Sequence, residues 1–123
     1  LDDGYLETYH FIPGVLHTVQ PIAEKEQVLA VNCREYTVLQ TEHFGPVLQM
    51  EVGAVLIGHI VNYHSHHRFK RGEEKGRFEY GGSTILLFFE KGRVRLHPQL
   101  FKSGSCGREV RLRMGQTIGS KEK

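Results

Sequence analysis

The sequence contains little that would support cross-linking or membrane insertion. It has no tryptophan and two cysteines among 123 residues, and Cys33 and Cys106 form no Cys-x-x-Cys pair of the kind that binds zinc. Two such thiols are expected to be free cysteines of a reducing compartment. No apolar run approaches the roughly 20 residues that a membrane-spanning helix needs, and no signal peptide is recognisable. We therefore expect any membrane contact to be peripheral or to be made by sequence outside this chain.

A strong charge of one sign is also missing. The formal net charge is +2, which gives no bulk attraction to nucleic acid, and no nucleic-acid partner is expected. A hydrophobic fraction of 39% and a charged fraction of 24% are typical of a folded globular protein. The length allows one domain with its own core. The chain begins at Leu1 without a methionine, so we expect a processed product or a fragment.

Helical periodicity is not apparent in any segment of ten or more residues. Short β-prone runs occur instead, and many of the 14 glycines separate them. The pattern predicts a mainly β fold, with 1–123 as a single barrel- or sandwich-like domain of short strands and Gly-rich turns. The runs are 28–31, 36–39, 47–57, 84–89, 94–96 and 110–112.

Two of these runs allow more specific predictions. In 47–52 apolar residues alternate with polar ones, which predicts a half-buried strand with Gln49 and Glu51 on its solvent side. Residues 84–89 are continuously apolar, as in a strand covered on both faces. We expect both runs in one sheet or packed layer.

The segment most informative for chemistry is Gly82-Ser83-Thr84, directly before an apolar run. A serine hydroxyl can attack the carbonyl of the preceding residue, and a glycine there leaves that carbonyl accessible and permits strained backbone geometry. The attack converts the amide to an ester. Elimination then breaks the chain and leaves dehydroalanine, which hydrolyses to a pyruvoyl group. That group can form a Schiff base with an amine and accept the electrons of a leaving carboxylate, as pyridoxal phosphate does. The alternative is an ordinary turn before a strand, and this short motif alone does not exclude it.

An ordered set of segments resembles the phosphatidylserine decarboxylase family. In that family a Lys/Arg-Gly-x-Glu-x-Gly-x-Phe segment precedes Gly-Ser-Thr and a strand, and residues 71–78 and 82–89 have this pattern. Each piece is short, but the ordered set over roughly residues 12–97 is specific. The other matching segments are Ile12-Pro13-Gly14, Asn32-x-Arg34-Glu35, Thr41-Glu42-x-Phe44-Gly45, Val52-Gly53-Ala54-x-x-Ile57-Gly58-x-Ile60 and, more weakly, Arg113-Met114-Gly115-x-x-Ile118-Gly119.

The resemblance implies a self-cleaving proenzyme. Ser83 would be the self-cleavage nucleophile and the precursor of a pyruvoyl cofactor, and Gly82 would supply the carbonyl that is attacked. Residues 1–82 would end the large subunit, and residues 83–123 would form the small subunit. The implied reaction is the decarboxylation of phosphatidylserine to phosphatidylethanolamine by an enzyme bound peripherally at the cytoplasmic face of a membrane.

The chain departs from the family pattern in two ways. Gly81 stands where the family usually has Leu or Phe, which loosens the backbone before the cut. The family's upstream Asp-Gly and Asp-Tyr-His-Arg segments, which supply an Asp and a His for self-cleavage and a His for decarboxylation, are absent. Asp3-Gly4 and Tyr9-His10 lie too close to Ile12 to replace them. We therefore expect this chain to be the C-terminal part of such a proenzyme and to be inactive alone.

A histidine-rich and basic loop at 59–71 leaves a non-enzymatic alternative open, a β module that binds metal or anionic lipid. Dense imidazoles can bind zinc or nickel, and basic side chains near a lipid surface contribute about 1 kcal/mol each. Because no carboxylate or cysteine stands at a matching spacing, we prefer a polar loop to a metal site. For the basic residues, contact with lipid headgroups and a solvated loop balanced by Glu73 and Glu74 both stay open. The residues concerned are His59, His64, His66, His67, Arg68, Lys70 and Arg71.

Three further residues were considered for roles at a site. Glu35, in the Asn-x-Arg-Glu segment, is expected to be able to orient substrate. His43 is expected to be a buried, hydrogen-bonded residue. Cys106 lies in a Gly/Ser-rich stretch with no base nearby in sequence, and we do not expect it to be a nucleophile.

Overall fold

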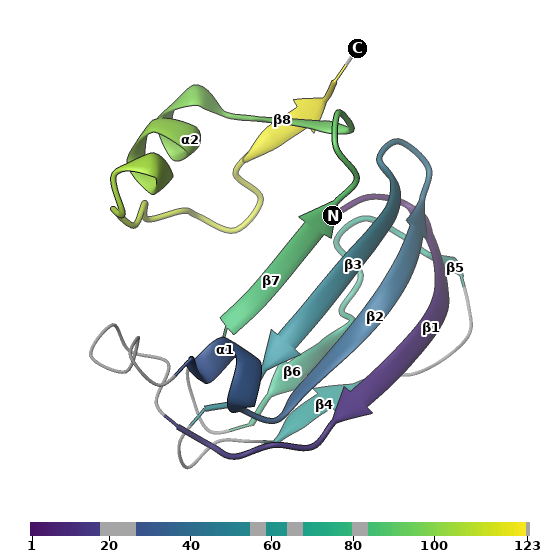
Figure 1. Cartoon of the computed structure of the whole chain (residues 1–123). Coiled ribbons are helices and arrows are strands. Elements are labelled where there is room, and N and C mark those ends of the chain that lie inside the picture. The colour runs from purple at the N-terminus through teal and green to yellow at the C-terminus, as the bar shows by residue number, and fades with distance from the viewer. Residues whose placement is uncertain (18–26, 55–58, 64–67, 80–83, 123) are drawn as a thin grey trace.

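The computed structural model describes residues 1–17, 27–54, 59–63, 68–79 and 84–122, and strands dominate it (Figure 1). A five-stranded antiparallel sheet has the order β5-β1-β2-β3-β7 and curls like half a barrel. This confirms the expectation of a mainly β fold. The sheet strands are β1 (Gly4–Ile12), β2 (Arg34–Thr41), β3 (Gly45–Val52), β5 (Arg68–Phe69) and β7 (Thr84–Phe89).

Two small antiparallel ribbons and two helices complete the described part. One ribbon pairs β4 (Ile60–Asn62) with β6 (Gly76–Phe78), and the other pairs β8 (Val94–Leu96) with β9 (Gly119–Lys121). The helices are α1 (Val28–Val31) and α2 (Pro98–Ser105). Neither is long and apolar enough to cross a membrane.

Part of the core lies on the face of the large sheet that the β4–β6 ribbon covers. Leu6, Leu39 and Val47 stand side by side on β1, β2 and β3, and all three are buried. Along β2 every second side chain from Glu35 to Leu39 is buried, because successive side chains of a strand point to opposite faces. The buried row therefore fixes the register of the three strands.

Three sequence-based expectations about elements were wrong. Residues 28–31 form the short helix α1, where the Asn32 N–H donates to the Val28 carbonyl at 3.0 Å. Residues 110–112 are not a strand. The strand β7 is an edge strand of this sheet, with Ile85 53% and Phe88 52% exposed, so it is not covered on both faces here. In each case the composition of the segment is as described, but it does not determine which other segments of the chain pack against it.

The Asn-x-Arg-Glu and Pro-Gly segments hold the chain before β2. The side chain of Asn32 is fully buried; its amide donates to the carbonyls of His17 at 2.7 Å and Gly53 at 2.8 Å and accepts from the His17 N–H at 3.0 Å. A Cβ atom on Gly14 would overlap the carbonyl oxygen of Val31. These residues therefore join three segments at the end of β3.

Two acidic residues fasten the N-terminus to the basic loop. The buried Asp2 carboxylate accepts from the His43 backbone N–H at 2.8 Å, from His43 Nδ1 at 3.0 Å and from Arg71 Nη2 at 3.2 Å. Lys70 Nζ donates to Asp3 at 2.9 Å. Burial opposes ionisation of Asp2, but the hydrogen bonds from His43 and Arg71 outweigh it and lower the pKa of this carboxyl. Asp3 and Asp2 thus pair with Lys70 and Arg71, which the sequence did not indicate, and Glu73 accepts from the Lys70 backbone N–H at 2.9 Å. The His43 side chain is hydrogen-bonded as expected, but it is 58% exposed and not buried.

Replacing Val47 by alanine should destabilise the chain by about 2 kcal/mol, because two buried methyl groups are lost and a cavity remains. Val47 is fully buried in the centre of β3. Urea unfolding followed by circular dichroism measures the change. Met114→Ala is the control, since Met114 is fully exposed and should change stability by less than about 0.5 kcal/mol. Equal effects of the two substitutions would contradict this placement of the core.

Asp2→Asn should lower stability at pH 7 and reduce the chain's sensitivity to acid. A carboxyl whose folded pKa lies below its unfolded value of about 3.9 stabilises the fold above that value, and this stabilisation is lost as the pH falls through the folded pKa. Unfolding free energies of both proteins between pH 7 and pH 3 test this. The exposed Glu109→Gln is the control and should leave the pH dependence unchanged. Parallel curves for Asp2→Asn and the unsubstituted chain would contradict the role of Asp2.

Candidate functional site

The expected cleavage residues Gly82 and Ser83 lie outside the described residues, but both flanks of the cut are described. The strand β6 ends at Phe78 on one side, and β7 begins at Thr84 on the other. Thr84 pairs with Val52, and the ladder between β3 and β7 continues to the pair Val47 and Phe89. The expectation that the two apolar runs share one sheet is confirmed for these residues.

The ribbon β4–β6 carries the chain toward the cut. Ile60 pairs with Phe78, and Asn62 pairs with Gly76. A Cβ atom at Gly76 would overlap the carbonyl oxygen of Val61, so this glycine of the family-like segment allows the two strands to approach. The N–H of Glu79 also donates to the His59 carbonyl at 3.1 Å. The pairing therefore extends to within three residues of Gly82 in sequence.

Charged side chains are buried between this ribbon and the large sheet. Glu51 of β3 is 4% exposed. Its carboxylate accepts from Lys75 Nζ at 2.9 Å, from Gln49 Nε2 at 2.7 Å and from Asn62 Nδ2 at 3.3 Å. The Lys75 side chain is itself only 20% exposed. The expectation that Glu51 faces solvent was wrong, because the β4–β6 ribbon covers the polar side of β3.

Glu35 belongs to the same cluster. It is 6% exposed and lies directly opposite Glu51 in the register of β2 and β3. Two carboxylates in such a position repel each other. Asn62 donates to both of them, and Lys75 supplies a positive charge to Glu51. Burying carboxylates in this way is costly unless they are paired and hydrogen-bonded.

A hollow of about 180 Å³ opens beside this cluster. Glu51 and Lys75 line it together with Arg77 and Phe78 from before the cut and Ile85 from after it. A space of this size can hold a small polar group along with water. Residues from both sides of the cleavage segment therefore line the hollow.

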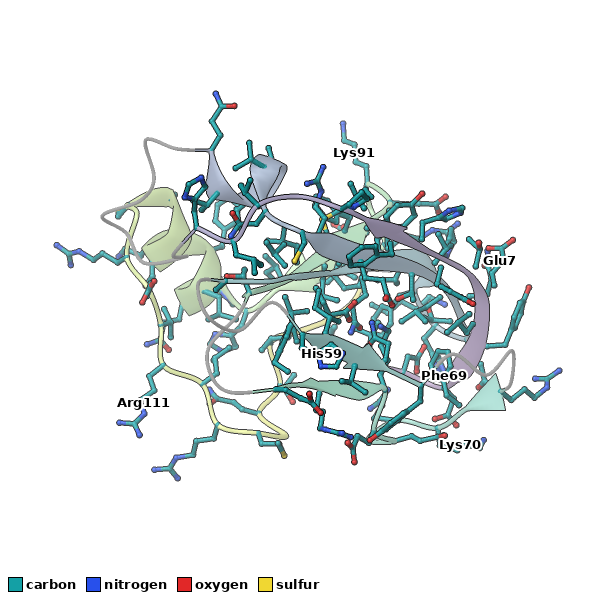
Figure 2. All side chains as sticks on the ribbon, turned by 90° about the horizontal axis from the view of Figure 1, so that it is seen from below. Glu7, His59, Phe69, Lys70, Lys91 and Arg111 are labelled. Atoms are coloured by element: carbon teal, nitrogen blue, oxygen red, sulfur yellow. The ribbon has the colours of Figure 1, made fainter. Side chains whose placement is uncertain are left out.

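An exposed polar network runs along the ribbon toward Glu79. His59 Nδ1 lies 2.6 Å from Glu79 Oε2, Arg77 Nη2 donates to Glu79 Oε1 at 3.0 Å, and Arg77 Nη1 donates to the Tyr63 hydroxyl oxygen at 2.9 Å. The hydrogen bonds from His59 and then Arg77 lower the pKa of the Glu79 carboxyl. In Figure 2, His59 lies below the large sheet and Lys91, in the turn after β7, lies above it.

The metal-binding alternative gains no support from the described residues. Among them, no group of three or more His, Cys, Asp or Glu side chains is arranged to hold a metal ion. The fold places the Glu79 carboxylate beside His59, although the two residues are far apart in the sequence. His64, His66 and His67 lie outside the described residues, so a role for them stays a prediction. Cys33 and Cys106 are not joined in a disulfide, and burial raises the pKa of the Cys33 thiol.

Sequence reasoning missed Asn62 and Lys75. Lys75 occupies an unspecified position of the family-like segment and Asn62 follows two apolar residues, so no local pattern marks either one. The Asn-x-Arg-Glu segment drew attention to Glu35, and strand alternation predicted the wrong face for Glu51. Only the folding of the ribbon onto the sheet brings the four side chains together.

Comparison with known proteins places these features in a family. A family model described as phosphatidylserine decarboxylase matches residues 1–120. Phosphatidylserine decarboxylase proenzyme 2 of Clostridium acetobutylicum is 46% identical over 120 residues, covering 97% of this chain and 41% of the relative. The proenzyme of Desulfitobacterium hafniense is 36% identical over 126 residues (100% of this chain, 42% of the relative), and that of Clostridium kluyveri is 38% identical over 124 residues (98% and 42%).

The chain thus spans about two fifths of the length of these curated relatives. No solved structure gives a significant match. The family match extends over nearly the whole chain and includes both the described flanks and the Gly82-Ser83-Thr84 segment. This chain therefore belongs to the phosphatidylserine decarboxylase family.

Proposed function

We propose that the protein containing this chain is a self-cleaving proenzyme that decarboxylates phosphatidylserine to phosphatidylethanolamine, and that the 123-residue chain supplies its cleavage segment. The observation that carries the proposal is Gly82-Ser83-Thr84 joined directly to a strand that β3 holds in place, in a chain whose relatives are named proenzymes. Residues 1–82 end the large subunit, and residues 83–123 form the small subunit.

Self-cleavage at Ser83 takes three steps: an acyl shift, an elimination and a hydrolysis. The hydroxyl oxygen attacks the Gly82 carbonyl, and the acyl group moves from nitrogen to oxygen, so that the amide becomes an ester and Ser83 gains a free amine. Removal of the α-proton of Ser83 then expels the Gly82 carboxylate and leaves dehydroalanine. Water replaces the nitrogen, which leaves as ammonia, and the small subunit begins with a pyruvoyl group. A general base must accept the α-proton.

The described residues directly after Ser83 are held in the large sheet. Thr84 is held by its pairing with Val52, and the next side chain, Ile85, is 53% exposed and lines the hollow with Lys75. A pyruvoyl group would supply an electrophilic carbonyl for the substrate amine and an acceptor for the electrons released by decarboxylation. The contribution of this chain is to hold Thr84, the residue after the attachment point, in a paired strand whose Ile85 lines a polar cavity.

The substrate also implies a location. Phosphatidylserine is a membrane lipid, so the enzyme must approach a bilayer surface, and we propose peripheral contact at the cytoplasmic face. The paired charges at Lys70 and Arg71 are less available for lipid headgroups than their sequence indicated. This favours the enzymatic reading of the chain over a lipid-binding module built on the basic loop.

Ser83→Ala in the full-length protein should abolish both self-cleavage and decarboxylation. Alanine has no oxygen to attack with and cannot yield dehydroalanine. Denaturing gels and intact mass report cleavage, and release of labelled carbon dioxide from phosphatidylserine reports turnover. Ser105→Ala, on α2, is the control and should behave like the unsubstituted protein. A Ser83→Ala protein that still decarboxylates would rule out the pyruvoyl mechanism.

The two products of cleavage should remain associated. Six residue pairs join β3 to β7 across the cut, from Val47–Phe89 to Val52–Thr84, and cleavage breaks none of them. Cleaved protein should therefore elute as one species from a sizing column without denaturant and separate only in urea or detergent. Elution of the small subunit alone under native conditions would contradict this arrangement.

A further inference from the structure

Glu51 contacts residues on both sides of the cut. Through its backbone it pairs with Ile85, two residues after Ser83. Through its carboxylate it binds Lys75, which directly precedes β6, and Asn62 on β4. One residue of β3 thus holds the strand that leads to the cleavage segment and the strand that leaves it.

The Glu51–Lys75 ion pair is also suited to hold β3 and the start of β6 at a fixed separation. Its N–O distance is 2.9 Å, and the side chains are 6% and 20% exposed. A buried pair resists separation because removing one partner leaves an uncompensated charge in a poorly solvated place. The exposed Glu90–Arg93 pair, in the turn after the same strand β7, also measures 2.9 Å, but both side chains are about half exposed, and such surface pairs contribute little.

We propose that Glu51 and Lys75 are positioning residues for self-cleavage: their ion pair sets the separation between the β6 and β7 flanks, and with it the approach of the attacking hydroxyl to the carbonyl. This inference rests on the proposed function and adds to it a pair outside the Gly-Ser-Thr segment. Neither residue exchanges a proton or forms a bond in the cleavage step. Their effect is on geometry, to which intramolecular attack is highly sensitive.

The test uses newly synthesised full-length precursor and follows the rate of cleavage between residues 82 and 83 on denaturing gels. Lys75→Met keeps the apolar stem and removes the charge, and Glu51→Gln keeps the shape and removes the charge. Each should slow cleavage at least tenfold. The double substitution should be no slower than either single one, because the pair acts as a unit. Glu90→Gln with Arg93→Met is the control pair and should cleave at the unsubstituted rate.

A second comparison separates positioning from general stability. Lys75→Arg restores a cation and should cleave within about threefold of the unsubstituted rate, whereas Lys75→Met should not. The same substitutions in an uncleavable Ser83→Ala background report folding by thermal unfolding. Slow cleavage at temperatures where the matched Ser83→Ala protein is fully folded supports positioning. Loss of cleavage that follows the unfolded fraction, or failure of all the variants to fold, overturns it.

The outcomes also distinguish this inference from the proposed function. If the unsubstituted precursor is never cut between Gly82 and Ser83, the proposed function fails. If it is cut and the Glu51 and Lys75 variants are cut at the same rate, only the positioning role fails. If Lys75→Arg is as slow as Lys75→Met, the charge is not what matters and the proposal is again wrong.

Discussion

The double pairing of β3 is the constraint on which the rest of the structure depends. Along one edge β3 pairs with β2 over its whole length, and along the other it pairs with β7 from Val47 to Val52. Val47 and Val52 are fully buried in it. The strand on its far edge begins at Thr84, directly after Ser83 in sequence, so the same hydrogen-bonded ladder holds the core of the sheet and the described flank that follows Ser83.

Under the proposed cut between Gly82 and Ser83, this arrangement would let the protein keep its fold. The peptide bond at the cut lies between β6 and β7, whereas the contacts that hold β7 come from β3, more than thirty residues earlier in sequence. Such long-range pairing does not depend on the continuity of the chain at the cut. Each flank must therefore be held by its own contacts, and β3 supplies both: it pairs with β7, and its Glu51 binds Lys75 next to β6.

Several residues of the family-like segments serve packing in the described structure. Asn32 joins three segments with its side-chain amide. Gly14 and Gly76 allow backbones to approach where a Cβ atom would overlap a carbonyl oxygen. Matches to the family motifs thus include residues that fix the packing of the backbone as well as the Gly82-Ser83-Thr84 segment. This is why an ordered set of short matches identified the family although each piece alone was weak.

The sequence by itself determined the mainly β class, the family, and the runs that form β2, β3, β7 and β8, because strand periodicity and short motifs are local properties. The tertiary structure alone decided which face of β3 is buried, since alternation marks two faces but cannot say which one a separate ribbon will cover. It also decided that β7 stands at an edge, that 28–31 turn into a helix, and that Glu35, Glu51, Asn62 and Lys75 converge. Those outcomes depend on contacts between residues far apart in the chain, and no local pattern encodes them.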